Sequence, residues 1–250
     1  MAVPLKAIVT GGASGIGAAT VAKLTEHGVR VAVLDVNEPP SGGTPFALAD
    51  LTDDAAVRRA TAALISELDG LDILVNNAGI GAAGTVETNP DDEWHRVFDV
   101  NVVGLVRVTR AALPALRRSP SAAIVNTSSV VATTGLSNRA LYSATKGAVL
   151  SLTLAMSADL LAEDIRVNAV LPGTTDTPWV GRLLDAADDP EAERAALNAR
   201  QPHGRLVRPE EVAAAIAFLA LPGAASLTGS TITIDGGLTT LRPQPTTRES

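Results

Sequence analysis

The chain has 250 residues, the length of one large domain or two small ones. Hydrophobic residues make up 46% of the sequence and charged residues 19%, which excludes an intrinsically disordered chain. The formal net charge of −7 excludes the basic surface expected of a protein that binds nucleic acid or anionic lipid. There is no cysteine, so disulfides and zinc–thiolate sites are excluded, and a reducing, cytoplasmic location is expected.

The sequence also argues against membrane spans and metal sites. Its longest apolar stretch, residues 212–227, is interrupted by Pro222 and is too short to cross a bilayer. The short apolar run at the N-terminus carries Lys6 and is not typical of a targeting segment. The three histidines lie far apart, without the spacing of metal ligands, so we predict no metal site.

Short runs rich in β-branched residues alternate with longer runs of helical periodicity. We predict strands at residues 5–10, 29–35, 71–76, 122–128, 165–171 and 230–235, and helices at residues 16–27, 53–68, 93–116, 142–161 and 209–221. A further strand is expected before Asp50, and the prolines and glycines of residues 36–47 predict a loop without a full helix. The alternation is typical of βαβ crossovers. The predicted fold is therefore α/β, a Rossmann-type doubly wound parallel sheet with helices on both faces.

We interpret residues 1–240 as a single domain of this fold. The strand–helix rhythm breaks at residues 173–208, which contain no predicted strand. Ligands of doubly wound sheets lie beyond the carboxyl ends of the strands, so an insert at this point is expected to cover a substrate. Residues 241–250 carry prolines and polar groups and are interpreted as a C-terminal tail, either loose or placed on a neighbouring subunit.

A glycine-rich motif, TGGASGIG, occupies residues 10–17 between a predicted strand and a predicted helix. Gly11 allows a tight turn, Gly15 lets the backbone approach a pyrophosphate, and Gly17 allows the helix to pack closely on the strand. The free N–H groups at the helix N-terminus would face the phosphates. A glycine-rich turn without a ligand is the alternative, but the strand and helix context favours dinucleotide binding.

Asp35 ends the second predicted strand, 18 residues after Gly17. A carboxylate there accepts hydrogen bonds from both adenosine ribose hydroxyls and repels a 2′-phosphate, and no Lys or Arg follows directly, so NAD is favoured over NADP. An aspartate that merely ends a strand is the alternative. Asp50 could accept from an adenine amino group with Leu51 near the ring, and Asn76–Gly79 would by itself be only a turn.

Tyr142 and Lys146 lie four residues apart in a predicted helix, on one face. The chain has one tyrosine and three lysines, so the pairing is informative. A free phenol is a poor base at neutral pH, and an adjacent ammonium, together with an oxidised nicotinamide, would move its pKa toward the working pH. A Tyr–Lys pair on the helix surface is the alternative.

Two further polar features carry possible chemistry. Ser128 and Ser129 end the strand before that helix, and either hydroxyl could donate a hydrogen bond to an alcohol or carbonyl oxygen. Asn101 lies inside the long predicted helix, where asparagine is a mediocre helix former. It could hold a water molecule in a proton path, or have no special role.

Taken together and in order, these motifs resemble the short-chain dehydrogenase/reductase family over Leu5 to Gly237, with the PG pair at 172–173 and IDGG at 234–237. The family's serine lies 13 residues before its tyrosine, which selects Ser129 over Ser128. The resemblance implies that Tyr142 is the general acid/base, that Lys146 lowers its pKa and binds the nicotinamide ribose, that Ser129 holds the substrate oxygen, and that Asn101 anchors a water relay. It implies coenzyme contacts from Gly11, Ser14, Gly15, Ile16, Gly17, Asp35, Asp50, Leu51, Asn77, Ala78, Gly79, Tyr142, Lys146, Pro172, Gly173, Thr175 and Thr177.

The implied reaction is hydride transfer between a secondary alcohol or ketone and NAD, by a protein that forms a homotetramer or a homodimer. The stretches 173–184 and 195–206 resemble members that act on 3-hydroxybutyrate, L-fucose and deoxy-sugar acids. Substrate contacts would then come from Ser129, Arg139, Tyr142 and Arg200, with both arginines binding a carboxylate. A third arginine of that subgroup falls at Leu183, with Arg182 one place off.

Several alternatives to this substrate stay open. Arg139 and Arg200 could be surface residues of an Arg-rich chain, and the substrate could be a neutral sugar or a neutral cyclic or steroid-like alcohol. A dinucleotide-sensing protein without catalysis is disfavoured by the complete Ser, Tyr and Lys set. A nucleotide-sugar epimerase or dehydratase would need a larger C-terminal domain.

Overall fold

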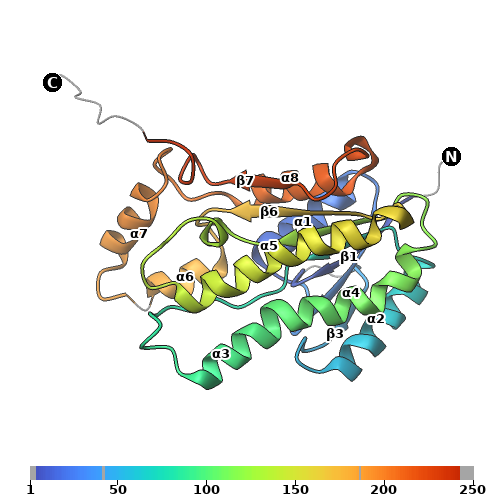
Figure 1. Cartoon of the computed structure of the whole chain (residues 1–250), viewed down its shortest axis with the longest axis horizontal. Helices are drawn as coiled ribbons and strands as arrows, with labels where there is room; N and C mark the ends of the chain where they lie inside the picture. The colour runs from blue at the N-terminus through green and yellow to red at the C-terminus, as the bar shows by residue number, and fades with distance from the viewer. Residues whose placement is uncertain (1–3, 41–42, 186, 243–250) are drawn as a thin grey trace.

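The computed structural model describes residues 4–40, 43–185 and 187–242. A seven-stranded parallel sheet has the order β3-β2-β1-β4-β5-β6-β7 (Figure 1). Its strands are β1 (Lys6–Thr10), β2 (Arg30–Asp35), β3 (Phe46–Leu48), β4 (Ile73–Asn76), β5 (Ala123–Thr127), β6 (Arg166–Pro172) and β7 (Thr231–Ile234). The predicted α/β fold with a doubly wound parallel sheet is therefore confirmed.

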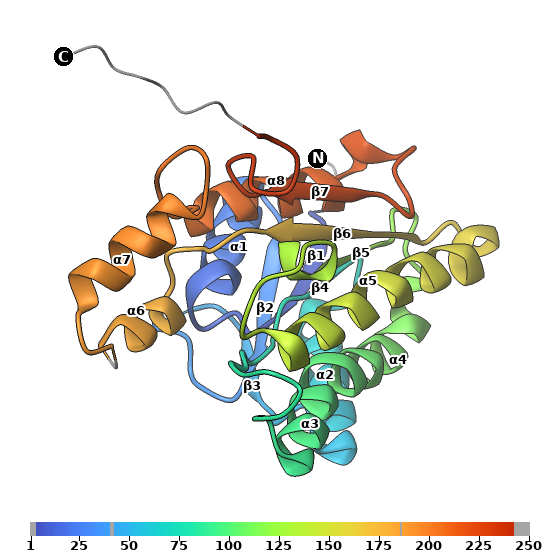
Figure 2. The ribbon, with the colours of Figure 1, turned by 60° about the vertical axis from the view of Figure 1, so that its left-hand side comes forward.

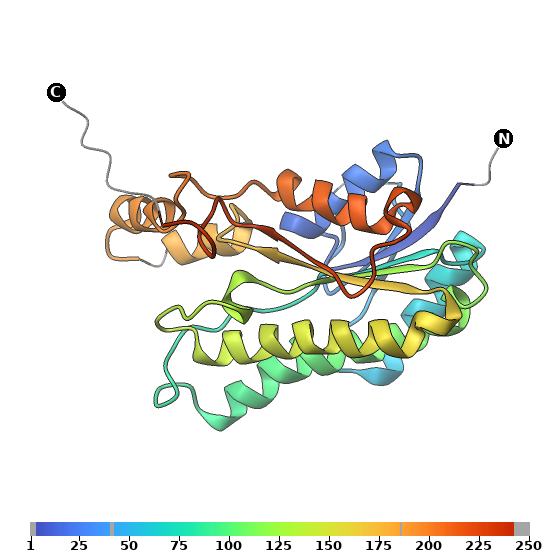
Figure 3. The same ribbon diagram turned by 45° about the horizontal axis from the view of Figure 1, so that its top comes forward.

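Helices cover both faces of this sheet (Figure 3). On one face, α1 (Gly15–Glu26) packs against α8 (Pro209–Ala220). On the other lie α2 (Asp54–Leu68), α4 (Gly104–Leu116) and α5 (Ala140–Leu160). Because both faces are covered, β4 and β5 are buried throughout, which explains their mainly apolar sequences. The edge strands β3 and β7 are partly exposed instead.

The strand order reverses between β1 and β4. From β1 the chain builds outward to β2 and β3, and it then returns to place β4 on the other side of β1. The loops after β1 and β4 consequently leave the sheet in opposite directions and open a crevice at the carboxyl ends of these strands. This is the position at which doubly wound sheets bind ligands.

The long helix predicted for residues 93–116 is interrupted, which corrects that prediction. The structure has α3 (Asp91–Phe98), a π-helical turn (Asp99–Val103) and then α4. Asn101 lies in the π-helical turn, and its buried side chain bonds to the backbone of Ile80 instead of pointing to solvent. A π-turn adds one residue to the helical repeat, and such turns are frequent at functional sites.

The described residues of the insert at 173–208 contain no strand, as the sequence predicts, but they do form two helices. These are α6 (Pro178–Asp185) and α7 (Pro190–Ala199). Val180, Leu184, Leu197 and Leu206 give them a small apolar core of their own. Both helices lie beyond the carboxyl end of β6, at one end of the molecule (Figure 2).

Other boundaries differ from the prediction by one or a few residues, and α5 begins at Ala140 instead of Tyr142. Of the tail predicted at residues 241–250, only Leu241 and Arg242 lie within the described residues. No helix in the described part of the chain is long and apolar enough to cross a membrane. The same residues contain no group of three His, Asp or Glu side chains arranged to hold a metal ion.

Candidate active site

A cavity of about 810 Å³ opens at the carboxyl ends of β1, β2, β4, β5 and β6, with α6 and α7 on its far side. Residues implied by the resemblance line it from every one of these elements. They are Gly11, Ser14, Gly15, Ile16, Asp35, Asp50, Leu51, Asn77, Ala78, Gly79, Ser129, Arg139, Tyr142, Lys146, Pro172, Gly173, Thr175, Thr177 and Arg200. Gly17 and Asn101 are not part of the wall; each supports residues that are.

The glycine loop at one end of the cavity depends on the absence of side chains. Gly11 has φ +66° and Gly15 has φ +54°, left-handed conformations that favour glycine. A Cβ at Gly17 would lie 1.9 Å from the carbonyl oxygen of Gly11. The helix α1 can therefore approach the loop closely only with glycine at position 17, and this approach points the N-terminus of α1 into the cavity.

The ends of β1 and β4 are joined at the side of this loop. The Thr10 hydroxyl accepts hydrogen bonds from the backbone N–H groups of Asn77 (3.0 Å) and Ala78 (3.1 Å). The Asn77 side chain donates to the carbonyl oxygens of Thr10 and Gly11. The sequence NNAG therefore does more than form a turn, because Asn77 and Ala78, which follow β4, hold the glycine loop in place.

Two carboxylates lie at the same end of the cavity. Asp35 accepts hydrogen bonds from the backbone N–H groups of Ala13 and Asn37, both at 3.0 Å. Asp50 accepts from the backbone N–H and the hydroxyl of Thr52 on one oxygen, both at 2.9 Å. The neighbouring wall residues Leu34, Val36 and Leu51 carry no charge. Among the described residues that line this end, none is a lysine or an arginine.

Ser129, Tyr142 and Lys146 meet at the middle of the cavity. Tyr142 and Lys146 lie one turn apart on α5, with the ammonium 5.7 Å from the centroid of the phenol ring. Lys146 is buried and donates to the carbonyl oxygen of Thr127 at 2.8 Å. The Ser128 hydroxyl donates to the carbonyl oxygen of Lys146 at 2.8 Å, whereas the Ser129 hydroxyl has only long contacts to the backbone, at Pro172 O and Val131 N, and lies beside the Tyr142 phenol. Ser129 is therefore the serine with a hydroxyl available to a ligand.

Burial is the largest influence on the pKa values of Tyr142 and Lys146. It raises the pKa of Tyr142 to about 12, while the Ser129 side chain and the charge of Arg139 act in the lowering direction. Burial also lowers the pKa of Lys146 to about 8. The predicted shift of the phenol pKa toward neutrality was assigned to the ammonium together with an oxidised nicotinamide, and without the coenzyme burial outweighs the charges of the protein. A further positive charge beside the phenol is needed for that shift.

Asn101 lies behind the cavity wall. Its side-chain amide donates to Ile80 O (2.9 Å) and to the Thr145 hydroxyl (3.2 Å), and its oxygen accepts from Ile80 N (2.8 Å). A Cβ at Gly79 would lie 3.1 Å from that oxygen and 3.5 Å from the Lys146 nitrogen. Asn101 thus joins the loop after β4 to α5 beside Lys146, and its side-chain oxygen, which accepts only from Ile80 N, has one lone pair left.

The opposite end of the cavity is rich in arginine. Arg139 and Arg200 both line it, and the pKa of Arg139 is lowered first by burial and then by the charge of Arg200. Arg182, Leu183 and Arg96 also line the wall, so the place of the third arginine is occupied by Leu183 with Arg182 beside it. None of these four arginines forms an ion pair within 4.0 Å in the part of the chain that the structure describes.

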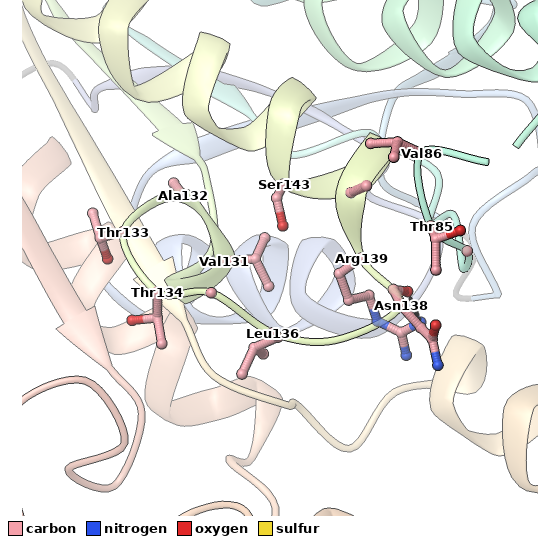
Figure 4. A pocket seen from close by; sticks show the side chains of 13 residues that line it. Thr85, Val86, Val131, Ala132, Thr133, Thr134, Leu136, Asn138, Arg139 and Ser143 are labelled. Carbon is pink, nitrogen blue, oxygen red and sulfur yellow. Dashed lines mark hydrogen bonds between the residues drawn. The ribbon is translucent and has the colours of Figure 1, made fainter. Parts of the chain in front are cut away.

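A second, more open hollow of about 540 Å³ lies behind this end and shares Val131, Leu136 and Arg139 with the main cavity (Figure 4). Figure 4 shows that the Ser143 hydroxyl points into it, from the helix turn that carries Tyr142. Ser143 and Tyr142 therefore face different spaces although they are adjacent in the sequence.

Among the wall residues at the substrate end that sequence reasoning missed are Arg96, Leu136 and Trp179. Trp179 follows Thr177 by two residues, so its distance from the PG pair is the signal that could have pointed to it. Arg96 and Leu136 carry no such signal, because the π-helical turn and the loop after β5 decide which way they face.

The comparisons with known proteins agree with this geometry. A family model described as enoyl-(acyl carrier protein) reductase matches residues 11–239. Cis-4-hydroxycyclohexanecarboxylate dehydrogenase of Sinomonas cyclohexanicum is 40% identical over 247 residues, covering 93% of this chain and 96% of the relative. The ligand-free aldohexose dehydrogenase of Thermoplasma acidophilum superimposes with a TM-score of 0.91 at 33% identity, over 97% of each chain. Actinorhodin polyketide ketoreductase with NADPH has a TM-score of 0.89 at 32% identity, over 96% of this chain and all of that one. With its glycine loop, its Ser–Tyr–Lys group and these relatives, the chain belongs to the short-chain dehydrogenase/reductase family.

Proposed function

We propose that this oxidoreductase is an NAD-dependent dehydrogenase of small hydroxy acids, either open-chain acids resembling 3-hydroxybutyrate or sugar-derived acids. The observation that carries the proposal is the position of Arg139 and Arg200, without ion-pair partners among the described residues, in the cavity that holds Ser129 and Tyr142. A homotetramer and a cytoplasmic location, as the resemblance and the composition imply, belong to the same proposal.

The residues present fit a nicotinamide dinucleotide. The left-handed glycines and the α1 N-terminus suit a pyrophosphate, and the cavity extends from Asp35 to Lys146. When bound, the nicotinamide supplies the acceptor or donor of the hydride. Asp35 would accept from the ribose hydroxyls, Asp50 and Leu51 would hold the adenine, and Thr175 and Thr177 would hold the nicotinamide.

The protein's own groups supply the proton chemistry. The Ser129 hydroxyl holds the substrate oxygen, and Tyr142 takes the proton of the alcohol or returns it to a ketone. Lys146, held by the Thr127 carbonyl group, places its charge beside the phenol and within reach of a ribose. Burial holds the phenol pKa at about 12 in the protein alone, and a positive charge bound beside Tyr142, as an oxidised nicotinamide would carry, would lower it.

The arginine end suits a carboxylate. A guanidinium presents two parallel N–H donors to the two oxygens of a carboxylate, and two arginines that repel each other are relieved by an anion between them. The name of the Sinomonas relative describes a substrate that carries both a hydroxyl and a carboxylate, which supports this assignment. A neutral cyclic alcohol or sugar is the second candidate, favoured by the apolar wall residues Val180, Leu183 and Leu197.

The carboxylate is tested by comparing a hydroxy acid with its methyl ester. Wild-type enzyme should reduce NAD with 3-hydroxybutyrate or with a sugar-derived hydroxy acid, and should prefer the better acid to its ester. Arg200→Gln should lower kcat/KM for the acid by about 10- to 100-fold, because a charge-assisted hydrogen bond is lost, and change the ester rate by less than about threefold.

Arg194→Gln is the matched control, since Arg194 lies on α7, the helix that ends directly before Arg200, pairs with Asp176 and does not line the cavity. It should leave both rates unchanged. An Arg200→Gln variant with wild-type kcat/KM for the acid would contradict the carboxylate assignment and favour the neutral alcohol.

The preference for NAD is tested at Asp35. Asp35→Ser should lower the ratio of kcat/KM with NAD to that with NADP by about 100-fold, because the repulsion of a 2′-phosphate and the bonds to the ribose are both lost. Asp50→Ser, which removes a carboxylate at the adenine, should weaken both coenzymes alike and leave the ratio unchanged. A wild-type enzyme that used NADP better than NAD would contradict the role given to Asp35.

A further inference from the structure

The indole of Trp179 packs against Gly81 at the wall of the cavity. Trp179 is the second residue of α6, and Gly81 lies in the loop after β4; both line the cavity. A Cβ built on Gly81 would lie 2.6 Å from Cζ2, 2.7 Å from Cε2 and 2.9 Å from Nε1 of the indole. The indole thus occupies the space that a side chain at position 81 would take.

The backbone does not require glycine at this position. Gly81 is not among the glycines with positive φ, in contrast to Gly11, Gly15 and Gly84. An L-residue could adopt the same conformation without strain, so steric space is the reason that the structure gives for glycine. Gly81 and Trp179 are therefore a complementary pair, in which the glycine makes room for the indole.

The pair bounds the cavity near the residues proposed for chemistry and for substrate binding. Gly81 follows Gly79, which lies beside the Lys146 nitrogen, and Trp179 precedes the wall residues Val180 and Arg182. Trp179 is 38% exposed, and its indole N–H has no hydrogen-bond partner among the described residues. A partly exposed aromatic ring of this kind can be removed or displaced without opening the core of the protein.

We propose that Trp179, seated on Gly81, is a specificity-determining residue that limits the size of the substrate. The indole fills the volume beside the reacting carbon, so a bulky group on that carbon is excluded while a methyl group fits. The substrate class follows from the function proposed above: short hydroxy acids and their ketones, with a small group opposite the carboxylate. Loss of the indole would widen the cavity toward the loop after β4.

The test compares two hydroxy acids that differ only in that group, 3-hydroxybutyrate and 3-hydroxy-3-phenylpropanoate. Trp179→Ala should raise the ratio of kcat/KM for the phenyl acid to that for 3-hydroxybutyrate by about 10- to 100-fold, the range expected when a pocket gains room for several carbon atoms. Trp179→Phe should give an intermediate ratio. An unchanged ratio in Trp179→Ala would overturn the proposal.

A double-mutant cycle with Gly81→Ala separates this role from general damage. With Trp179 present, the added methyl group should push the indole into the cavity and lower kcat/KM for 3-hydroxybutyrate at least about tenfold. With Trp179→Ala, the same methyl group should have an effect below about threefold. Equal effects of Gly81→Ala in the two backgrounds would overturn the pairing.

Trp94→Phe supplies both the control and a readout that needs no turnover. Trp94 packs on Phe98, with ring centroids 6.2 Å apart, and does not line the cavity, so its loss should leave the substrate ratio unchanged. In that background Trp179 is the sole tryptophan, and Gly81→Ala should shift its fluorescence emission, whereas an unshifted emission would contradict the contact. If wild-type enzyme oxidises neither acid, the hydroxy-acid function fails, and the size test is carried by 2-butanol and 1-phenyl-1-propanol.

Discussion

Replacing Tyr142 by phenylalanine should lower kcat by about 10²- to 10⁴-fold, the usual contribution of a positioned general acid or base. The dissociation constant for NADH should change by less than about threefold, because the phenol ring stays in place on α5 and only its hydroxyl is lost. The measurement is steady-state turnover together with NADH fluorescence titration. Turnover that survives the substitution would remove Tyr142 from the proposed chemistry.

The pH dependence of alcohol oxidation tests the role of Tyr142 independently. Alcohol oxidation needs the phenolate form of Tyr142, so the wild-type rate should rise with pH until the phenol has lost its proton. Burial in the protein alone holds the phenol pKa at about 12, and the charged nicotinamide must lower it, so the rise should lie below that value. Tyr142→Phe should lose this rise.

Ser143→Ala is the control for Tyr142. Its hydroxyl points into the separate hollow of Figure 4, so removal of one oxygen atom there should leave kcat and the pH profile as in the wild type. An equal loss of activity in both variants would indicate disturbance of α5 rather than loss of a proton-transferring group.

The second large effect is expected from a single methyl group at Gly17. Gly17→Ala should weaken NADH binding by at least about 100-fold, since its Cβ would lie 1.9 Å from the Gly11 carbonyl oxygen and 2.7 Å from the Asn77 amide nitrogen. Relief of this overlap must move either α1 or the glycine loop, and overpacking of this kind typically costs about 1–3 kcal/mol or more. Fluorescence titration measures the binding, and thermal unfolding measures the stability.

Gly147→Ala is the matched substitution for Gly17→Ala. Gly147 lies in α5 with no atom within 4 Å of the place that a Cβ would take, so alanine there should leave coenzyme binding unchanged and stabilise the fold by roughly 0.5–1 kcal/mol. If Gly17→Ala unfolds, binding of NADH to the folded fraction at low temperature still separates the two effects. Wild-type affinity in that fraction would contradict the packing argument.

The sheet could be predicted from the sequence because the same pattern of apolar strands and glycine turns recurs along the chain. Strands such as β4 and β5 are buried on both faces, so their apolar runs stand out, and glycines mark the turns between strands and helices. The edge strand β3 could be predicted only as a strand before Asp50, without bounds, since three partly exposed residues do not form a recognisable apolar run. The motif residues converge on one cavity because parallel strands end at one edge.

What could not be predicted depends on contacts between distant segments. The π-helical turn at Asn101 is set by its bonds to Ile80, 21 positions earlier in the chain. The indole of Trp179 is explained by Gly81, on a different loop. The pKa of Tyr142 is raised by burial, which a spacing of four residues to Lys146 does not reveal. Local patterns therefore locate the chemical groups, whereas their environment comes from the tertiary structure.

The three side-chain bonds of Asn101 have a consequence for mutagenesis of this enzyme. Truncation to alanine would leave the N–H and carbonyl of Ile80 without their Asn101 partners, at a point buried from solvent, and would remove the bond that the Thr145 hydroxyl accepts. Weakened folding and slowed turnover would then come together in such a variant, so an inactive Asn101 mutant would not by itself report on proton flow. Measuring the melting temperature of each Asn101 variant together with its turnover rate therefore distinguishes a loss of structural support from the loss of a group that takes part in the reaction.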